Sequence, residues 1–350
     1  MHSSEILDSF LFKIMRDNLT PSLCVTVVDH DKVLYKNVQG YRAVLPYEEE
    51  ADEDTLYDLS GLSKVVQTAL LAARLIEKGQ LSFDTKVSDV LEFSGNYADV
   101  TVLELLTHTA GFVSEMRLSD YVDTPEKAIS FILKTKPMYE RGKGEAYSCF
   151  GYIILGKILE KVAGIPLEAA AVKYVYEPLG MSHTFLNPYE KGYRNIASTD
   201  FDELTGKMIK GIVHDENSKF LGGVAGNAGV FSNLADMEIV MKMFLNKGKL
   251  PDGSEFLSEE MVDKMTSDYT PGYPDARGIG FILGTRGNPP IHMDRDYVGY
   301  GHTGFTGTSM WIVPEKDLAV CLLTNHIHPS KGEHRLIGRL KDFHDMIFGK

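Results

Sequence analysis

Strand-forming segments lie at both ends of this 350-residue chain, and mostly helical segments lie between them. Residues 22 to 29 (SLCVTVVD) and 32 to 41 (KVLYKNVQGY) are rich in β-branched and aromatic residues, so we expect a hairpin there. Beyond about residue 275 three more such runs follow, GIGFILGT, TSMWIVP and LAVCLLTN. This arrangement predicts one sheet built from both ends of the chain, with the helices packed around and beside it.

Helical periodicity marks the middle of the chain. Apolar residues recur at helical spacing over residues 62 to 79, where Gly79 ends the pattern. Further helices are expected over residues 101–108, 125–134, 150–163 and 234–246, and a last one over about 335–348. Residues 186–230 carry Gly, Asn and Tyr without a period, which is typical of functional or mobile segments.

We therefore expect an α+β fold with a mainly antiparallel sheet formed by both chain ends and flanked by helices, beside a mostly helical lobe. Residues 1–60 and 275–350 would form the sheet lobe and residues 61–274 the helical lobe of a single domain. A cleft between the two lobes is the natural place for a site.

Composition excludes several function classes. The net charge of -13 would repel nucleic acid and anionic bilayers. No stretch approaches the roughly 18 apolar residues of a membrane span, and residues 1–20 have the pattern of an amphipathic helix rather than an export signal. The three cysteines are scattered, without metal-type spacing. We expect a reduced, cytoplasmic protein without a cofactor; a mature exported form stays open.

Three short motifs carry polar residues next to the start of a helix or strand. G-L-S-K (61–64) opens the helix expected over 62–79, and Tyr147 in YSCFGYIILG directly precedes another helix. The third motif, GHTGFTGTSMWIVP, places His302, Thr303 and Gly304 before a strand.

The order and spacing of these motifs resemble the serine β-lactamase and penicillin-binding-protein superfamily. The closest match is the branch with class C β-lactamases, family VIII esterases and D-amino-peptidases or carboxypeptidases. Supporting stretches are TVLELLTHTAGF (101–112), EPLGMSHT (177–184) and VHDENSKFLGGVAGNAGVFS (213–232). The resemblance spans about residues 22 to 330 and implies a β-lactamase-like fold and a serine hydrolase that works through an acyl-enzyme.

The resemblance also implies roles for individual residues. A serine at position 61 would be the nucleophile at a helix N-terminus, with Lys64 one turn further on. Lys64 can act as a base only if its surroundings keep it partly neutral. Tyr147 would be a second proton carrier, made more acidic by Lys64. The backbone N–H groups of residue 61 and Phe305, just after His302-Thr303-Gly304, would form the oxyanion hole.

Three residues depart from the family pattern. Gly61 replaces the nucleophile and has no side chain to acylate. His302 stands where β-lactamases usually have lysine, which weakens the expected grip on a substrate carboxylate. Cys149 replaces the usual asparagine and removes an amide that would orient substrate and Lys64.

Alternatives remain for the nucleophile and for nearby polar residues. Ser60 is an alternative nucleophile one residue early, although a capping role suits it better. Ser63 points elsewhere, and a Cys149 thiol nucleophile conflicts with the family geometry, which places that side chain beside the substrate. His108 is expected to pack the helical lobe. His214, Asp215 and Glu216 suggest a metal at first sight, but no fourth ligand follows, so we expect no metal site.

These features predict a hydrolase of an ester, amide, D-amino-acid peptide or β-lactam, with Lys64, Tyr147 and His302 assisting the water that deacylates it. Gly61, whether natural or engineered, predicts that this chain is inactive. The alternative is a non-catalytic pseudoenzyme that binds cell-wall peptide fragments or a regulatory ligand. The partner is thus a small molecule or peptide; the sequence fixes neither its identity, nor the oligomeric state, nor the pathway.

Overall fold

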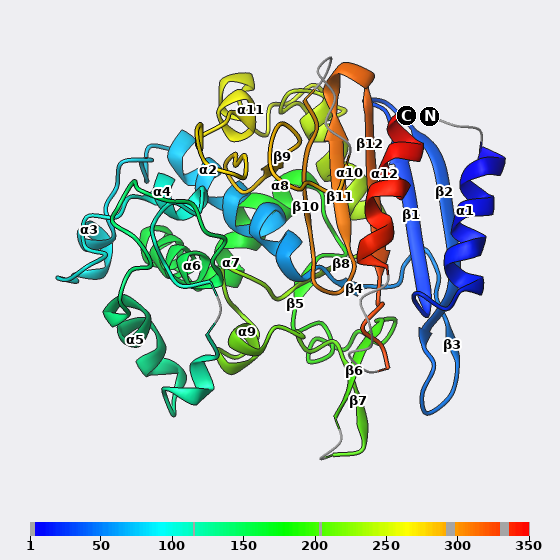
Figure 1. Cartoon of the computed structure of the whole chain (residues 1–350), viewed down its shortest axis with the longest axis horizontal. Helices are drawn as coiled ribbons and strands as arrows, with labels where there is room; N and C mark the ends of the chain where they lie inside the picture. Colours follow the sequence, from blue (N-terminus) through cyan, green and yellow to red (C-terminus); the bar gives the residue numbers. More distant parts are fainter. Residues whose placement is uncertain (1–3, 115, 203–204, 292–297, 330–335, 350) are drawn as a thin grey trace.

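A seven-stranded antiparallel sheet forms one side of the molecule (Figure 1) in a computed structural model that describes residues 4–114, 116–202, 205–291, 298–329 and 336–349. Its strand order is β3-β2-β1-β12-β11-β10-β9. At its centre β1 (Ser22–Val28) pairs antiparallel with β12 (Leu318–Thr324), so both chain ends contribute to one sheet, as predicted. The other strands of this sheet are β2 (Val33–Ala43), β3 (Glu49–Glu50), β9 (Ile282–Leu283), β10 (Tyr300–Thr303) and β11 (Ser309–Val313).

Both faces of the sheet are covered, which explains why β1 and β12 are buried along their whole length. Along β1, Leu23, Val25 and Val27 pack in a core with α1 (Ser4–Arg16) and α12 (Leu340–Phe348). The side chains on the opposite face of β1 join the main core, to which α10 (Leu234–Leu245) also belongs. The two-residue period of a strand therefore gives each face an apolar surface.

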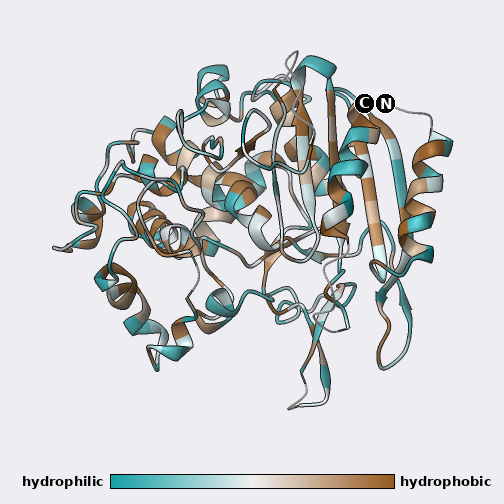
Figure 2. Ribbon diagram, in the orientation of Figure 1, coloured by the Kyte–Doolittle hydropathy of each residue, from teal (hydrophilic) through white to brown (hydrophobic). Residues whose placement is uncertain are grey.

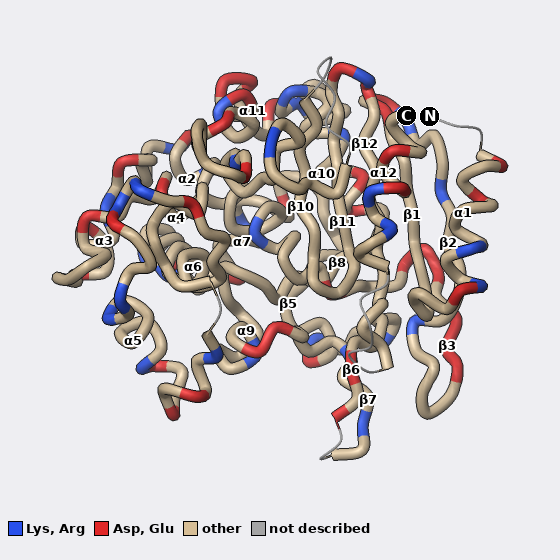
Figure 3. The backbone as a smooth tube through the Cα atoms, viewed as in Figure 1, with Lys and Arg blue, Asp and Glu red and all other residues tan. Residues whose placement is uncertain are grey.

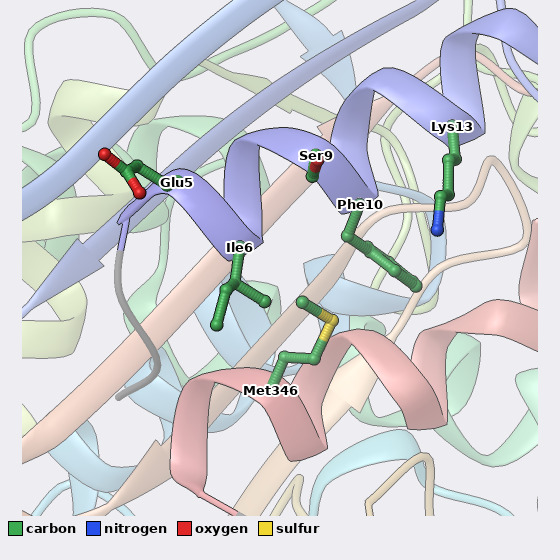
Figure 4. Close-up of a pocket in the computed structure, with 6 residues that line it drawn as sticks. All are labelled: Glu5, Ile6, Ser9, Phe10, Lys13 and Met346. Carbon is green, nitrogen blue, oxygen red and sulfur yellow. The ribbon is translucent and has the colours of Figure 1, made fainter.

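The contact between α1 and α12 ties the two ends of the chain together on the outer face of the sheet (Figure 1). Ile6 and Phe10 of α1 point toward Met346 of α12 around a small hollow of about 370 Å³ (Figure 4). The Arg339 guanidinium lies 5.7 Å from the centre of the Phe10 ring. The residues around this hollow are those of two amphipathic helices that pack together, and they hold no cluster of reactive groups.

The rest of the molecule is mostly helical, with apolar residues toward the interior (Figure 2) and acidic and basic residues interspersed over the outside (Figure 3). None of the helices within the described ranges is long and apolar enough to cross a bilayer. The helices are α2 (Leu70–Glu77), α3 (Val87–Leu91), α4 (Val102–Leu106), α5 (Ala128–Lys134), α6 (Cys149–Ala163), α7 (Leu167–Ala171), α8 (Glu177–Leu179), α9 (Glu216–Phe220) and α11 (Glu259–Thr266).

Two small antiparallel groups of strands accompany these helices. The first has the order β4-β8-β5, made of β4 (Tyr57–Asp58), β8 (Val230–Ser232) and β5 (Phe185–Leu186). The second pairs β6 (Ser198–Asp202) with β7 (Lys207–Lys210) at the edge of the molecule (Figure 1). Sequence periodicity missed these short strands because two to five residues are too few to show a period.

Several predicted elements differ in detail. The helix expected over 62–79 begins with a 3₁₀ turn over Ser60–Leu62 and a π-helical segment over Lys64–Ala69 before α2. The last helix begins at Leu340, and the start expected near residue 335 lies outside the described residues. The run GIGFILGT contributes only the two residues of β9.

We predict that His344 makes folding sensitive to mild acid. The ring is buried on α12, with Nδ1 2.5 Å from Pro290 O and Nε2 3.2 Å from Ser309 Oγ, and burial lowers its pKa to about 4. Below the ordinary pKa of about 6.5, the unfolded chain binds a proton that the folded chain rejects. This contribution to stability is therefore complete above pH 6.5 and is lost as the pH falls through about 4.

Chemical denaturation at pH 7 and pH 5 measures this effect. His344→Gln should reduce the loss of unfolding free energy between the two pH values by about 2 kcal/mol, which follows from 1.36 kcal/mol per unit of pKa shift. An identical loss in both proteins would contradict the assignment of a neutral, buried His344.

Candidate active site

A cleft of about 1130 Å³ brings together residues that are far apart in the sequence. Its lining combines the segment before α6, the end of β10 and the start of the central helix, the name used below for the continuous helix of residues 60–77. The residues predicted from the three motifs all line it: Ser60, Gly61, Lys64, Tyr147, Cys149, His302, Thr303, Gly304 and Phe305. The structure therefore places the sequence-predicted site residues in one cleft.

Asp58 fixes the start of the central helix. Its Oδ1 accepts a hydrogen bond from the Ser60 N–H at 2.8 Å, and its Oδ2 accepts one from the His214 N–H at 2.8 Å. Burial raises the pKa of Asp58 to about 6, although these two bonds pull it down. Ser60 takes φ +49°, in the left-handed region that residues with a side chain rarely adopt.

Gly61 faces the cleft, but the space beside its Cα is narrow. A Cβ at this position would lie 2.6 Å from the Thr303 carbonyl oxygen, 3.1 Å from His302 Cε1 and 3.4 Å from the Tyr147 hydroxyl. The last two contacts place His302 and the Tyr147 hydroxyl next to position 61. The first is too short for any carbon, so a serine here would require the Thr303 backbone to move.

The turn after β10 docks directly onto the start of the central helix. Thr306 Oγ1 donates to Asp58 O at 2.7 Å, and Thr308 Oγ1 donates to Leu59 O at 3.0 Å. Gly304 lies so close that a Cβ there would be 2.4 Å from Leu59 O. The glycine of the His302-Thr303-Gly304 motif is therefore required by this close approach rather than by a turn conformation.

Lys64 is fully buried, and its ammonium lies among polar and aromatic groups. Nζ donates to the Asn227 carbonyl at 2.9 Å, lies 3.6 Å from Cys149 Sγ and stands 4.8 Å from the centre of the Tyr147 ring. Burial alone would lower the pKa of Lys64, but Cys149, Tyr147 and Asp215 outweigh burial and raise it above its ordinary value. Lys64 is therefore a fixed positive charge rather than a partly neutral base.

Glycines bring the Asn227 segment to the central helix. A Cβ on Gly226 would lie 2.1 Å from Tyr152 O, so only glycine allows this segment to lie against α6. Successive carbonyls of the segment then accept hydrogen bonds from the central helix, as Gln67 Nε2 donates to Ala225 O, Thr68 Oγ1 to Gly226 O and Lys64 Nζ to Asn227 O.

Tyr147 lies between Lys64 and two histidines. Its ring centre is 4.7 Å from that of His108 and 6.0 Å from that of His302. Burial raises the pKa of Tyr147 more than Lys64 lowers it. Lys64 thus lowers the pKa of the phenol as expected, but the removal of the hydroxyl from water outweighs this charge, and the net pKa lies above the ordinary value.

His108 positions the segment that carries Tyr147. His108 Nδ1 accepts a hydrogen bond from the Ser148 N–H at 3.1 Å, and the His108 carbonyl accepts one from the Ala146 N–H at 3.0 Å. Burial drives the pKa of His108 well below its ordinary value, so the ring is neutral and Nδ1 can accept. The packing role predicted for His108 thus includes holding both neighbours of Tyr147.

His302 is neutral and incompletely paired. Its Nδ1 lies 2.7 Å from the Thr303 carbonyl and so carries the proton. Nε2 is buried and has no hydrogen-bond partner among the described residues. Burial, together with the charge of Lys64, lowers the pKa of His302 to about 3. No permanent cation therefore stands at this position.

The predicted oxyanion donor on Phe305 is already engaged. Its backbone N–H donates to Ser60 Oγ at 3.1 Å, so a substrate carbonyl would have to displace this hydroxyl. The same bond directs Ser60 Oγ toward Phe305. Ser63 Oγ, for its part, accepts from the Val230 N–H at 3.2 Å.

Sequence reasoning missed several polar residues of the cleft. Asn227 Nδ2 donates to Asp215 Oδ1 at 3.0 Å, while Asn227 Oδ1 is buried without a partner among the described residues. Arg277 pairs with Glu145 at 2.9 Å and lies 5.9 Å from the Tyr147 ring centre. Asn227 and Asp215 belong to residues 213–232, one of the stretches that carry the family resemblance, but neither Arg277 nor Glu145 stands in such a motif.

The His214-Asp215-Glu216 stretch serves the local fold of the cleft rim. Asp215 caps α9 by accepting from the Ser218 N–H at 2.7 Å, and Glu216 pairs with Arg117. His214 stacks on Phe305, with ring centres 5.6 Å apart. Within the described ranges, no three His, Cys, Asp or Glu side chains gather as a metal site would require.

Comparison with known proteins gives a consistent family and fold. The family model described as Beta-lactamase matches residues 7–342. The N-acetylmuramyl-L-alanine amidase of Bacillus subtilis is 31% identical over 353 residues, which cover 88% of this chain and 78% of that protein. A putative D-alanyl-D-alanine carboxypeptidase of Salmonella heidelberg is 28% identical over 347 residues, covering 88% of this chain and 79% of that protein.

Two solved structures show the same fold. The octameric penicillin-binding protein homologue from Pyrococcus abyssi has a TM-score of 0.78 and 24% identity, covering 99% of this chain and 77% of that one. A class C β-lactamase from Rhodobacter sphaeroides has a TM-score of 0.78 and 20% identity, covering 99% of both chains.

We predict that Gly304→Ala destabilises the protein by about 1–3 kcal/mol, because its Cβ would force apart the docked turn and helix start. Chemical denaturation gives the free energy of unfolding. Gly338→Ala is the matched control, since a Cβ at Gly338 has no atom within 4 Å. Equal unfolding free energies for the two variants would contradict the close docking.

Proposed function

The chain belongs to the β-lactamase family, and we propose that its cleft binds an ester, an amide, a D-amino-acid peptide or a β-lactam but forms no acyl-enzyme at Gly61. The observation that supports this most directly is the convergence of Tyr147 and His302 on the Cβ position of Gly61, with Lys64 beside Tyr147. The proton-handling groups of a serine hydrolase thus surround a residue that has no hydroxyl.

In this proposal the chemistry of the fold needs a hydroxyl at position 61. That oxygen would attack the substrate carbonyl carbon while its proton passes to the Tyr147 oxygen. Tyr147 would pass its own proton to the leaving alcohol or amine as the bond to the carbonyl carbon breaks, and the Lys64 charge would stabilise the Tyr147 oxygen during this relay. Water would then release the acyl group with the help of Tyr147 and the neutral His302. Residues 303–305 would line the substrate, with the Phe305 N–H available once Ser60 Oγ is displaced.

The names of the relatives favour a cell-wall substrate. One is named an amidase of N-acetylmuramyl-L-alanine, and another a putative carboxypeptidase of D-alanyl-D-alanine. Both names describe an amide within peptidoglycan-type compounds. We therefore place a peptide or amide of this kind first among the proposed ligands.

Restoring the missing groups tests the proposal. We predict that Gly61→Ser combined with Cys149→Asn becomes covalently labelled by a fluorescent penicillin or a fluorophosphonate. The rate should exceed that of Gly61→Ala combined with Cys149→Asn by at least about a hundredfold, since removal of such nucleophiles costs far more than this. Intact-mass spectrometry measures the adduct.

The alanine variant is the matched control because both variants carry the Cβ that must move the Thr303 backbone, and only one carries the hydroxyl. Circular dichroism establishes that both are folded. Equal labelling of two folded variants would overturn the acyl-enzyme chemistry proposed for this cleft.

The second candidate is a cleft adapted to binding alone, in which even a serine restored at position 61 would not react, and the narrow space at Gly61 favours it. The 2.6 Å separation from the Thr303 oxygen to a Cβ at this position means that the wall of the cleft fits glycine. Calorimetry with a peptide ending in D-Ala-D-Ala separates the candidates. Tight binding that is unchanged in Gly61→Ser, together with no labelling of that variant, would favour the binding role.

A further inference from the structure

Cys149 stands in a different setting from the other two cysteines. It is the first residue of α6, a helix of 15 residues, and its Sγ lies 3.6 Å from the Lys64 ammonium. It is partly exposed and lines the cleft, whereas Cys24 and Cys321 are buried in the sheet. A neighbouring cation and a helix N-terminus both stabilise a thiolate.

The second observation concerns two unpaired acceptors in the same cleft. His302 Nε2 and Asn227 Oδ1 are buried acceptors without a partner among the described residues, and both residues line the cleft. Both residues interact with Lys64, which donates to the Asn227 carbonyl and carries the charge that disfavours protonation of His302. A buried acceptor without a hydrogen bond is energetically unfavourable, so these atoms would be satisfied by a ligand with N–H or O–H donors.

We propose that Cys149 is the acyl-accepting nucleophile of this chain, and that it takes its acyl group from the ester or amide class named above. The inference rests on the proposed function of the cleft and deepens it, because it assigns a covalent step to the chain as it stands. The thiol occupies the cleft beside the same lysine that would serve a serine at position 61.

The acyl transfer to Cys149 needs no reactant other than the substrate and water. The Cys149 thiol loses its proton to water at the open side of the cleft, and the thiolate attacks the carbonyl carbon. A carbon–sulfur bond forms, the carbon–oxygen or carbon–nitrogen bond of the substrate breaks, and the leaving alcohol or amine takes up a proton from water. Lys64 stays protonated throughout and stabilises first the thiolate and then the developing oxyanion.

Substrate orientation would come from the two unpaired acceptors. An amide N–H or a hydroxyl next to the reacting carbonyl would donate to His302 Nε2 or Asn227 Oδ1. Because His302 is neutral, its Nε2 can accept a hydrogen bond from such a donor. A neutral ring has no positive charge that would attract a substrate carboxylate. The chemistry therefore favours substrates with polar N–H or O–H groups, such as amino-acid or sugar derivatives.

Acetylation of the unmodified chain tests the proposal. The full chain is treated with p-nitrophenyl acetate at pH 7, and the adduct is located by peptide mass spectrometry. We expect one acetyl group on Cys149, released by neutral hydroxylamine as a thioester would be, and formed at least tenfold faster than on glutathione in the same solution. Cys24 and Cys321 serve as internal controls and should remain unmodified.

Two variants separate a nucleophile from a merely exposed thiol. Cys149→Ser should lose the adduct, and Lys64→Met should form it about tenfold more slowly, because the cation that stabilises the thiolate is gone. Cys149→Ser changes only one atom in the cleft. It therefore tests whether Cys149 is the nucleophile even if Lys64→Met does not fold.

Several outcomes would overturn the proposal: no adduct, an adduct on Ser60 or Lys64, or a Cys149 rate no higher than that of glutathione. A different experiment tests the proposed function: equal penicillin labelling of the Gly61→Ser and Gly61→Ala chains, both carrying Cys149→Asn, would contradict it. Each proposal can therefore be refuted without the other.

Discussion

The buried ammonium of Lys64 is the constraint on which the candidate site depends. An isolated charge in a protein interior is costly, and losing one of its partners destabilises a protein by several kcal/mol. Here the partners come from two segments remote from the central helix, the carbonyl of Asn227 on one side and Tyr147 and Cys149 on the other. The need to satisfy this charge helps to hold the helical region together around the cleft.

The surroundings of Lys64 also decide what it can do. Its pKa is raised, so the residue supplies charge rather than a free base. The neighbouring histidines respond to the same field, because the pKa values of both His108 and His302 are lowered by burial and by this cation. The charge of Lys64 therefore favours the ionised form of an acidic group beside it, while the two histidines stay neutral.

Much of the architecture could be predicted from the sequence. The β-branched runs at both chain ends correctly predicted the antiparallel sheet, since β1 and β12 are buried on both faces and their composition shows it. Motif order was enough to predict the family and to bring Lys64 and Tyr147 into one cleft. The sequence could not show how deeply Tyr147 is buried, and this burial raises the pKa of Tyr147 above its ordinary value instead of lowering it.

Close approaches between remote segments were equally invisible in the sequence. No local pattern reveals that Thr303 O fills the space beside Gly61, or that Ser60 Oγ accepts from the Phe305 N–H. Asn227 escaped attention because its contact with Lys64 is made by a backbone carbonyl, which every residue possesses. Glycines are the one sequence feature that indicates such close approaches, because Gly226 and Gly304 both stand where one backbone packs against another.

The most direct test of this account is the protonation state of Lys64, measured by nuclear magnetic resonance of its Cε and Nζ atoms as the pH is raised. We predict that Lys64 remains an ammonium up to at least about pH 10, because its pKa lies above the ordinary value. Loss of its proton near pH 7 or 8 would contradict the account, since Lys64 would then be a base and the site would need a different chemistry.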